Sequence, residues 1–163
     1  MYIYLYVLLM LGSCCMLRAE DEQQQFDKKP ITETCLLCMC EALSGCNATA
    51  VCVNGACGIF RLTWDQWVDS GRLTIAGDSP LSESSFTNCA NDPHCAADTL
   101  QNYMVKYGQD CNGDEQQNCL DYGAIHYMGP FNCQADMPYT FASIFRKCLK
   151  RAELPVKLLK VLL

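Results

Sequence analysis

The sequence predicts an α+β domain in which several short helices surround one small β-hairpin and disulfides hold the parts together. Three observations lead to this prediction: fourteen cysteines in 163 residues, apolar residues at helical spacing between capping residues, and an Asn-Gly pair at 54–55 flanked by short apolar runs. With 50% apolar and 10% aromatic residues, the chain can bury the core of one domain.

The first nineteen residues are expected to be a signal peptide (1–19). Residues 3–11 form an uncharged apolar run of signal-peptide length, and Ala19 suits the position before cleavage. A lipoprotein-type cleavage and a retained anchor helix stay open as alternatives. The rest of the chain divides into a flexible leader (20–32), a folded domain (33–154) and a frayed C-terminal tail (155–163).

Cysteine usage predicts a secreted, extracellular protein. Without the signal peptide the chain keeps twelve cysteines, an even number that predicts six disulfides of open connectivity in an oxidising compartment. A zinc site on the Cys-x-x-Cys-x-Cys spacing is the weaker alternative, so we expect no metal and no cofactor. The expected disulfide cysteines are Cys35, Cys38, Cys40, Cys46, Cys52, Cys57, Cys89, Cys95, Cys111, Cys119, Cys133 and Cys148.

The net charge limits the classes of partner that are expected, and one short motif predicts a modification. Eighteen acids against twelve bases give a net charge of −6, which argues against nucleic acid because phosphate contacts need a basic face. We also expect no membrane association after signal removal, and a monomer. Asn47 begins an Asn-Ala-Thr sequon for N-glycosylation, which would place that loop on the surface.

The first helix and the hairpin follow from local signals. Thr32 or Thr34 can cap a helix that runs to Gly45, a residue suited to ending it. The hairpin is expected over 51–60, because Asn-Gly favours the type I′ turn that tight hairpins need.

The remaining elements are predicted to be helical. A capping box at 63–66 starts a short helix, and an Asp-Pro pair at 92–93 starts a longer one that Gly108 ends. Other helices are expected over Ser82–Cys89, Cys119–Met128 and Tyr139–Leu154.

An ordered set of motifs resembles the invertebrate-type (i-type) lysozymes, also called the destabilase family. The set covers about residues 33–150 and looks most like the insect branch. Its parts are Cys-x-x-Cys-x-Cys with Ser-Gly-Cys at 35–46, Cys-Gly-Ile-Phe at 57–60, Trp67, Asn-Cys-Ala-Asn-Asp-Pro-His-Cys-Ala at 88–96, Gln-Asn-Tyr-Met at 101–104 and His-x-x-Gly-Pro-x-x-Cys at 126–133.

The resemblance implies a lysozyme-like fold with a cleft between a helical part and a small hairpin. It also implies hydrolysis of the β-1,4 bond between N-acetylmuramic acid and N-acetylglucosamine in peptidoglycan. Some relatives are credited with an isopeptidase activity as well, but the serine expected there is Ala56 in this chain, with Ser44 and His126 remaining.

The two carboxyl groups of such a site are missing from their expected positions. Retaining glycoside hydrolysis uses a general acid and an ionised partner roughly 5 Å apart. Active members carry the acid immediately before Ser-Gly-Cys, where this chain has Leu43. The loop expected to bear the second acid is short here and has none over 52–57. We therefore expect no intact catalytic pair and weak or absent muramidase activity.

Two acids are the weak substitutes, and three other residues are candidates for glycan binding. Glu41 lies about 200° around the helix from residue 43 and so would face away from the cleft. Asp65 falls in the first turn of a helix, where a carboxylate complements the dipole.

Trp64, Tyr103 and His126 are the glycan-binding candidates, with peptidoglycan or a related glycan as partner. An active lysozyme using a displaced acid such as Glu41, and a secreted protein that binds no glycan, remain the alternatives.

Overall fold

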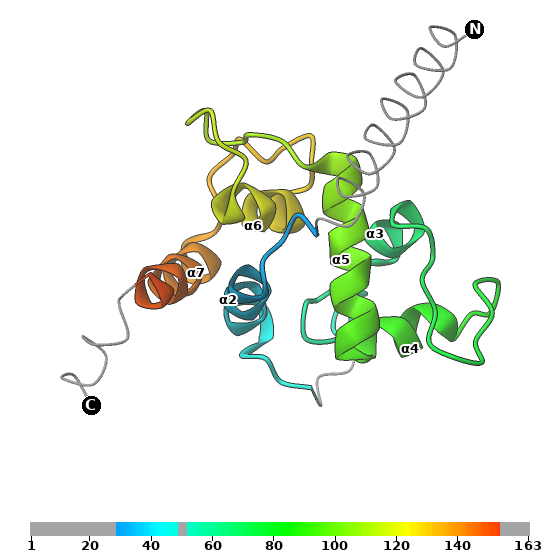
Figure 1. The fold of residues 1–163 in the computed structure, drawn as a ribbon. Helices are drawn as coiled ribbons and strands as arrows, with labels where there is room; N and C mark the ends of the chain where they lie inside the picture. The colour runs from blue at the N-terminus through cyan, green and yellow to red at the C-terminus, as the bar shows by residue number, and fades with distance from the viewer. Residues whose placement is uncertain (1–28, 49–51, 154–163) are drawn as a thin grey trace, which may run out of the picture.

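The computed structural model describes residues 29–48 and 52–153 (Figure 1). The predicted signal peptide, most of the leader and the tail therefore lie outside the described residues, as does the last residue of the sequon. Within the described part, the helices are α2 (Glu33–Ser44), α3 (Trp64–Asp69), α4 (Ser85–Asn91), α5 (Pro93–Tyr107), α6 (Cys119–Met128) and α7 (Tyr139–Ala152).

Helix ends follow the capping chemistry predicted from the sequence. The Thr32 hydroxyl accepts a hydrogen bond from the Cys35 amide, and Gly45 ends α2 in the left-handed region at φ 66°. The capping box at the start of α3 is confirmed, with Thr63 and Gln66 each accepting from the other's backbone. Local sequence therefore determines where these two helices begin.

The hairpin is smaller than expected, and one helix is shifted. Val53 and Ala56 pair across an Asn54-Gly55 turn with both residues at positive φ, as a type I′ turn requires. The predicted return arm through residue 60 is wrong beyond Ala56, because Cys57 pairs instead with Leu62 and the chain turns again at 58–61. The helix predicted over 82–89 instead runs to Asn91, directly before the cap of α5.

Six disulfides pair all twelve cysteines of the described ranges. Cys35–Cys119 joins α2 to α6, and Cys38–Cys148 joins α2 to α7. Closing loops of 84 and 110 residues restricts the unfolded chain most, about 4–5 kcal/mol each in the chain-entropy model. The other four bonds are Cys40–Cys46, Cys52–Cys57, Cys89–Cys95 and Cys111–Cys133.

The helices pack into two neighbouring groups around one core. α7 lies beside α2, while α3 and α4 pack against the long α5 (Figure 1). Trp67, Leu100 and Phe145 are fully buried in this core. Gly123 of α6 lies so close to Phe145 that an added Cβ would stand 2.3 Å from its ring, so α6 and α7 approach tightly. None of the described helices has the length and apolarity of a membrane span.

Candidate active site

A pocket of about 430 Å³ opens where four helices meet the turn at 58–61. One wall is apolar: Ala42 and Leu43 come from α2, and Phe141 and Ile144 come from α7. The disulfide between α2 and α7 fixes these two helices relative to each other. Leu43, which stands at the expected position of the general acid, thus lies in the pocket wall.

The floor of the pocket is a closed network of buried polar groups. His126 Nε2 lies 2.7 Å from the carbonyl oxygen of Phe60, which can only accept, so Nε2 carries the proton. His126 Nδ1 then accepts from Gln66 Nε2 at 3.2 Å. The Gln66 amide also donates to the His126 carbonyl at 3.0 Å, and its oxygen accepts from the Thr63 amide. The network holds the turn at 58–61, α3 and α6 together.

His126 is neutral in this setting. Burial lowers the pKa of His126 to about 4, and the hydrogen bond to the Phe60 carbonyl opposes this only in part. A protonated ring would also place a second N–H against the Gln66 amide donor. His126 therefore acts as a structural element of the floor and does not supply charge or protons near neutral pH.

The pocket contains no carboxylate among the described residues that line it, and Arg61 is their only formally charged side chain. Glu41 is turned towards the end of α7, where its carboxylate accepts from Arg151 at 2.6 Å. Asp65 is exposed in the first turn of α3 and does not line the pocket, although Gln66 beside it does. The pocket walls thus offer no group of the kind that protonates a glycosidic oxygen.

The three glycan-binding candidates lie in different surroundings. His126 is part of the pocket floor. Trp64 is half-exposed outside the pocket and contacts the Trp67 and Phe86 rings at 5.0 and 5.6 Å. Tyr103 is buried on α5, where burial raises the pKa of its hydroxyl to about 12. Only one of the three therefore lies at the pocket.

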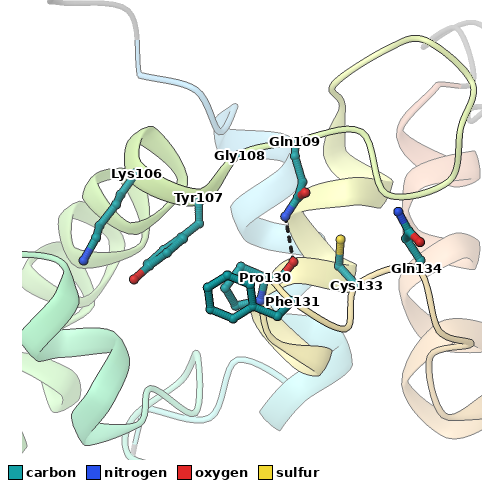
Figure 2. A pocket seen from close by; sticks show the side chains of 8 residues that line it. All are labelled: Lys106, Tyr107, Gly108, Gln109, Pro130, Phe131, Cys133 and Gln134. Atoms are coloured by element: carbon teal, nitrogen blue, oxygen red, sulfur yellow. Dashed lines mark hydrogen bonds between the residues drawn. The ribbon is translucent and has the colours of Figure 1, made fainter.

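A second pocket of about 470 Å³ lies between the end of α5 and the loop after α6 (Figure 2). Gln109 donates to the Pro130 carbonyl at 2.7 Å and ties the two segments together. Phe131 is 95% exposed and meets the Tyr107 ring edge-on at 6.3 Å. Asp69 accepts hydrogen bonds from Lys106 and from the Tyr107 hydroxyl, both at 2.8 Å. The bond from Lys106, and to a smaller extent the bond from Tyr107, lower the pKa of Asp69.

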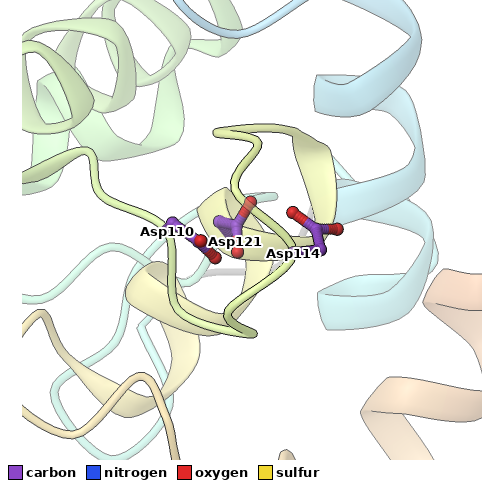
Figure 3. A group of neighbouring side chains, drawn as sticks. All are labelled: Asp110, Asp114 and Asp121. Atoms are coloured by element: carbon purple, nitrogen blue, oxygen red, sulfur yellow. The ribbon is translucent and has the colours of Figure 1, made fainter.

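Three carboxylates, two from the loop between α5 and α6 and one from the first turn of α6, converge (Figure 3). Oxygens of Asp110, Asp114 and Asp121 lie within 4.8 Å of one another, a set that could hold a hard cation such as Ca²⁺. Each of the three already accepts hydrogen bonds. Asp121, fully buried, accepts from the amides of Cys111 and Asn118 at 3.0 and 2.8 Å. Backbone donors thus account for the convergence without a metal.

Gln66 and Arg61 are among the pocket residues that the sequence did not single out for this site. Gln66 was recognisable only as a cap, and nothing in its capping-box pattern indicates that its amide also binds His126. Arg61 adopts φ 52°, a left-handed conformation that its residue type gives no reason to expect. Neither residue's part in the pocket has a local sequence signal.

A disulfide-stapled helical fold with a pocket beside a tight turn defines a lysozyme-like protein, and solved structures agree. Inhibitor-bound lysozyme from Meretrix lusoria superposes with a TM-score of 0.58 at 25% identity, over 74% of this chain and 92% of that one. Meretrix lusoria lysozyme in complex with Aeromonas hydrophila PliI superposes with a TM-score of 0.59 at 24% identity, with the same coverage of both chains.

Sequence comparison gives the family. The destabilase family model matches residues 32–148. The chain is 32% identical to "Lysozyme" of Ostrea edulis over 117 residues, which is 68% of this chain and 76% of the relative. It is 29% identical to "Invertebrate-type lysozyme 3" of Caenorhabditis elegans over 103 residues, 61% of this chain and 73% of the relative. The chain belongs to the invertebrate-type lysozyme, or destabilase, family.

Proposed function

We propose that this protein is a secreted lysozyme-family protein that binds peptidoglycan or a related glycan and has weak or absent muramidase activity. The observation that supports this most is Leu43 in the wall of a pocket that has no carboxylate among its described lining residues. Six disulfides in the described ranges support secretion, since such bonds persist in oxidising compartments.

The missing acid has a large kinetic consequence. A general acid protonates the leaving oxygen and contributes typically about 10²- to 10⁴-fold to the rate. Leucine cannot donate a proton, and the neutral, fully hydrogen-bonded His126 cannot replace it. With no anion among the described residues of the pocket wall, an oxocarbenium-like transition state also lacks an electrostatic partner there.

Binding is separable from catalysis and can persist. Transition-state stabilisation depends on groups that act on developing charge, whereas ground-state affinity depends on shape, burial and polar contacts. The pocket walls are fixed by disulfides and by the buried network around His126, so the pocket is preorganised for a ligand.

A muramidase assay beside a peptidoglycan pull-down tests the proposal. The disulfide-bonded protein should sediment with insoluble peptidoglycan while releasing reducing ends at no more than about 1% of the rate of an active i-type lysozyme. Glu41→Gln should leave both readouts unchanged, because Glu41 pairs with Arg151 outside the pocket.

Two results would overturn it. Vigorous release of reducing ends that Glu41→Gln abolishes would identify an active lysozyme with a displaced acid. A protein that neither cleaves nor sediments with peptidoglycan would instead be a secreted protein that binds no glycan.

A further inference from the structure

Positive charge is concentrated in the C-terminal part of the sequence. Six of the twelve Lys and Arg residues fall within residues 146–163, whereas only one of the eighteen Asp and Glu residues does. The rest of the chain is therefore acidic, and the two signs of charge are separated along the sequence. The bases of this region that belong to α7 are Arg146, Lys147, Lys150 and Arg151.

The bases of α7 lie on the side of the helix that points away from the core. All four are exposed, whereas Phe141, Phe145 and Cys148 are buried. At about 100° per residue, the four bases span about 140° of the helix surface, centred nearly opposite Phe145. We call the surface formed by Arg146, Lys147 and Lys150 the basic face. Arg151 lies beside it and pairs with Glu41 at 2.6 Å.

The basic face is not neutralised within the part of the chain that the structure describes. The ion pairs between described residues all involve other bases. Arg146 and Lys150 are four positions apart, a spacing at which like charges disfavour a helix. The helix dipole favours bases in the last turn, where Lys150 and Arg151 lie, but it does not account for Arg146 and Lys147. An anionic partner would relieve the repulsion between these bases.

A pocket of about 610 Å³ borders the basic face, between the start of α6 and the end of α7. Arg146 and Lys150 both line it, and Gln116 and Asn118 add side-chain amides. Glu153 is the one acid among the described lining residues, which do not include the three aspartates of Figure 3. Two cations at one opening suit an anionic group that has several acceptor oxygens.

We propose that the basic face docks a phosphodiester polymer attached to the glycan of the cell wall. Arg146 and Lys150 are about 6 Å apart along the helix axis, and a polyol phosphate chain repeats its charge over a similar length. The arginine fork can bind two oxygens of one phosphate, and the lysines act as point charges for its neighbours. The acidic remainder of the chain repels the same polymer, so binding orients the protein with α7 towards it.

The basic face is separate from the Leu43 pocket, although the choice of a wall polymer as partner rests on the proposed function. Arg146, Lys147 and Lys150 are not among the described residues that line the Leu43 pocket. Binding at the face and binding in the pocket can therefore be measured independently.

The packing of α7 favours a polymer over an anionic lipid surface. A helix that lies on a membrane buries an apolar face among the lipids. The apolar side of α7 is instead buried in the core, and Cys38–Cys148 ties the helix to α2. The last two turns of α7 thus present positive charge to a partner.

The test compares wall fragments that retain their glycerol phosphate polymer with the same fragments stripped of it by hydrofluoric acid. At about 0.05 M salt, the disulfide-bonded protein should sediment with intact fragments at least about tenfold more tightly than with stripped ones. The preference should fall to under about threefold at about 0.5 M salt, because the contacts are screened. NMR titration with the free polymer should shift the amide signals of α7.

Two triple variants with the same change of charge locate the effect. Replacing Arg146, Lys147 and Lys150 by Gln should abolish the preference for intact fragments and leave binding to stripped ones unchanged. Glutamine is a good helix former, and all three positions are exposed, so the variant is expected to fold. The matched control, which should keep the preference, replaces one arginine and two lysines elsewhere by Gln: Arg72, Lys29 and Lys106.

The outcomes separate this inference from the proposed function. Equal binding of the wild type to intact and stripped fragments would overturn the basic face and leave the proposed function intact. Binding to intact fragments alone would support the face and overturn glycan binding, and binding to neither would overturn both. Equal losses in the two triple variants would overturn the face, since the effect would then be one of net charge. Tighter binding to phosphatidylglycerol vesicles than to the free polymer would also overturn it, in favour of a lipid surface.

Discussion

The two ends of α6 differ in the acidic side chains that surround them. At the first end, Asp110 and Asp114 of the preceding loop converge with Asp121 of the first turn, and Asp121 is fully buried among backbone donors. At the other end, His126 lines a pocket whose described lining residues include no carboxylate. The comparison teaches that the chain buries the Asp121 carboxylate where amide N–H groups stabilise it, while no acid is found among the described residues that line the pocket.

The largest expected effect is at the acidic end. Asp121→Ala leaves the amides of Cys111 and Asn118 without their acceptors, and charge-assisted bonds of this kind are worth about 1.5–3 kcal/mol each. We expect the free energy of unfolding to fall by about 3 kcal/mol in denaturant titrations with the disulfides intact. Asp114→Ala, which removes an exposed acid of the same cluster, should cost under about 1 kcal/mol. Equal effects of the two variants would contradict the distinction between a buried and an exposed acid.

At the C-terminal end of α6, the buried His126 should make the free energy of unfolding depend on pH. Burial lowers the pKa of His126 from its ordinary value of 6.5 to about 4, so the unfolded chain binds a proton there before the folded chain does. Stability from this group is therefore complete above pH 6.5 and is lost as the pH falls towards 4. The loss is about 3 kcal/mol in total, from 1.36 kcal/mol per unit of pKa.

The window between pH 6.5 and 4.5 suits the measurement, because the carboxylates titrate mostly below it. Unfolding free energies of the wild type should fall across this window, and those of His126→Gln should fall much less. A variant with the same slope as the wild type would show that other groups cause the pH dependence.

Features that depend on neighbouring residues could be predicted from the sequence, whereas those that depend on distant contacts could not. Caps such as Thr32 and the box at 63–66 follow from contacts within four residues, so their prediction succeeded. The length of the hairpin was not predicted correctly, because its second turn depends on Arg61 in the left-handed region and on Gly58 contacting the backbone of α4. Those contacts join residues about 30 positions apart, which no local pattern encodes.

The pocket was predictable in part for the same reason. Motif order identified the position of Leu43, which the fold brings into the pocket wall. The link between Gln66 and His126 spans 60 residues, and that between His126 and Phe60 spans 66. The pairing of the twelve cysteines was equally open, since sequence alone gives their number and not their partners.

The smallest expected effect separates Glu41 from the pocket. Its ion pair with Arg151 is partly exposed, and pairs of this kind contribute about 0–1 kcal/mol. Glu41→Gln should therefore lower the unfolding free energy by no more than about 0.5 kcal/mol and leave peptidoglycan binding unchanged. Arg151→Gln should match it in both measurements, because the two side chains are partners. A loss of glycan binding in Glu41→Gln alone would show that the Glu41 carboxylate takes part in the binding site. The contrast between the two ends of α6 would then be weaker.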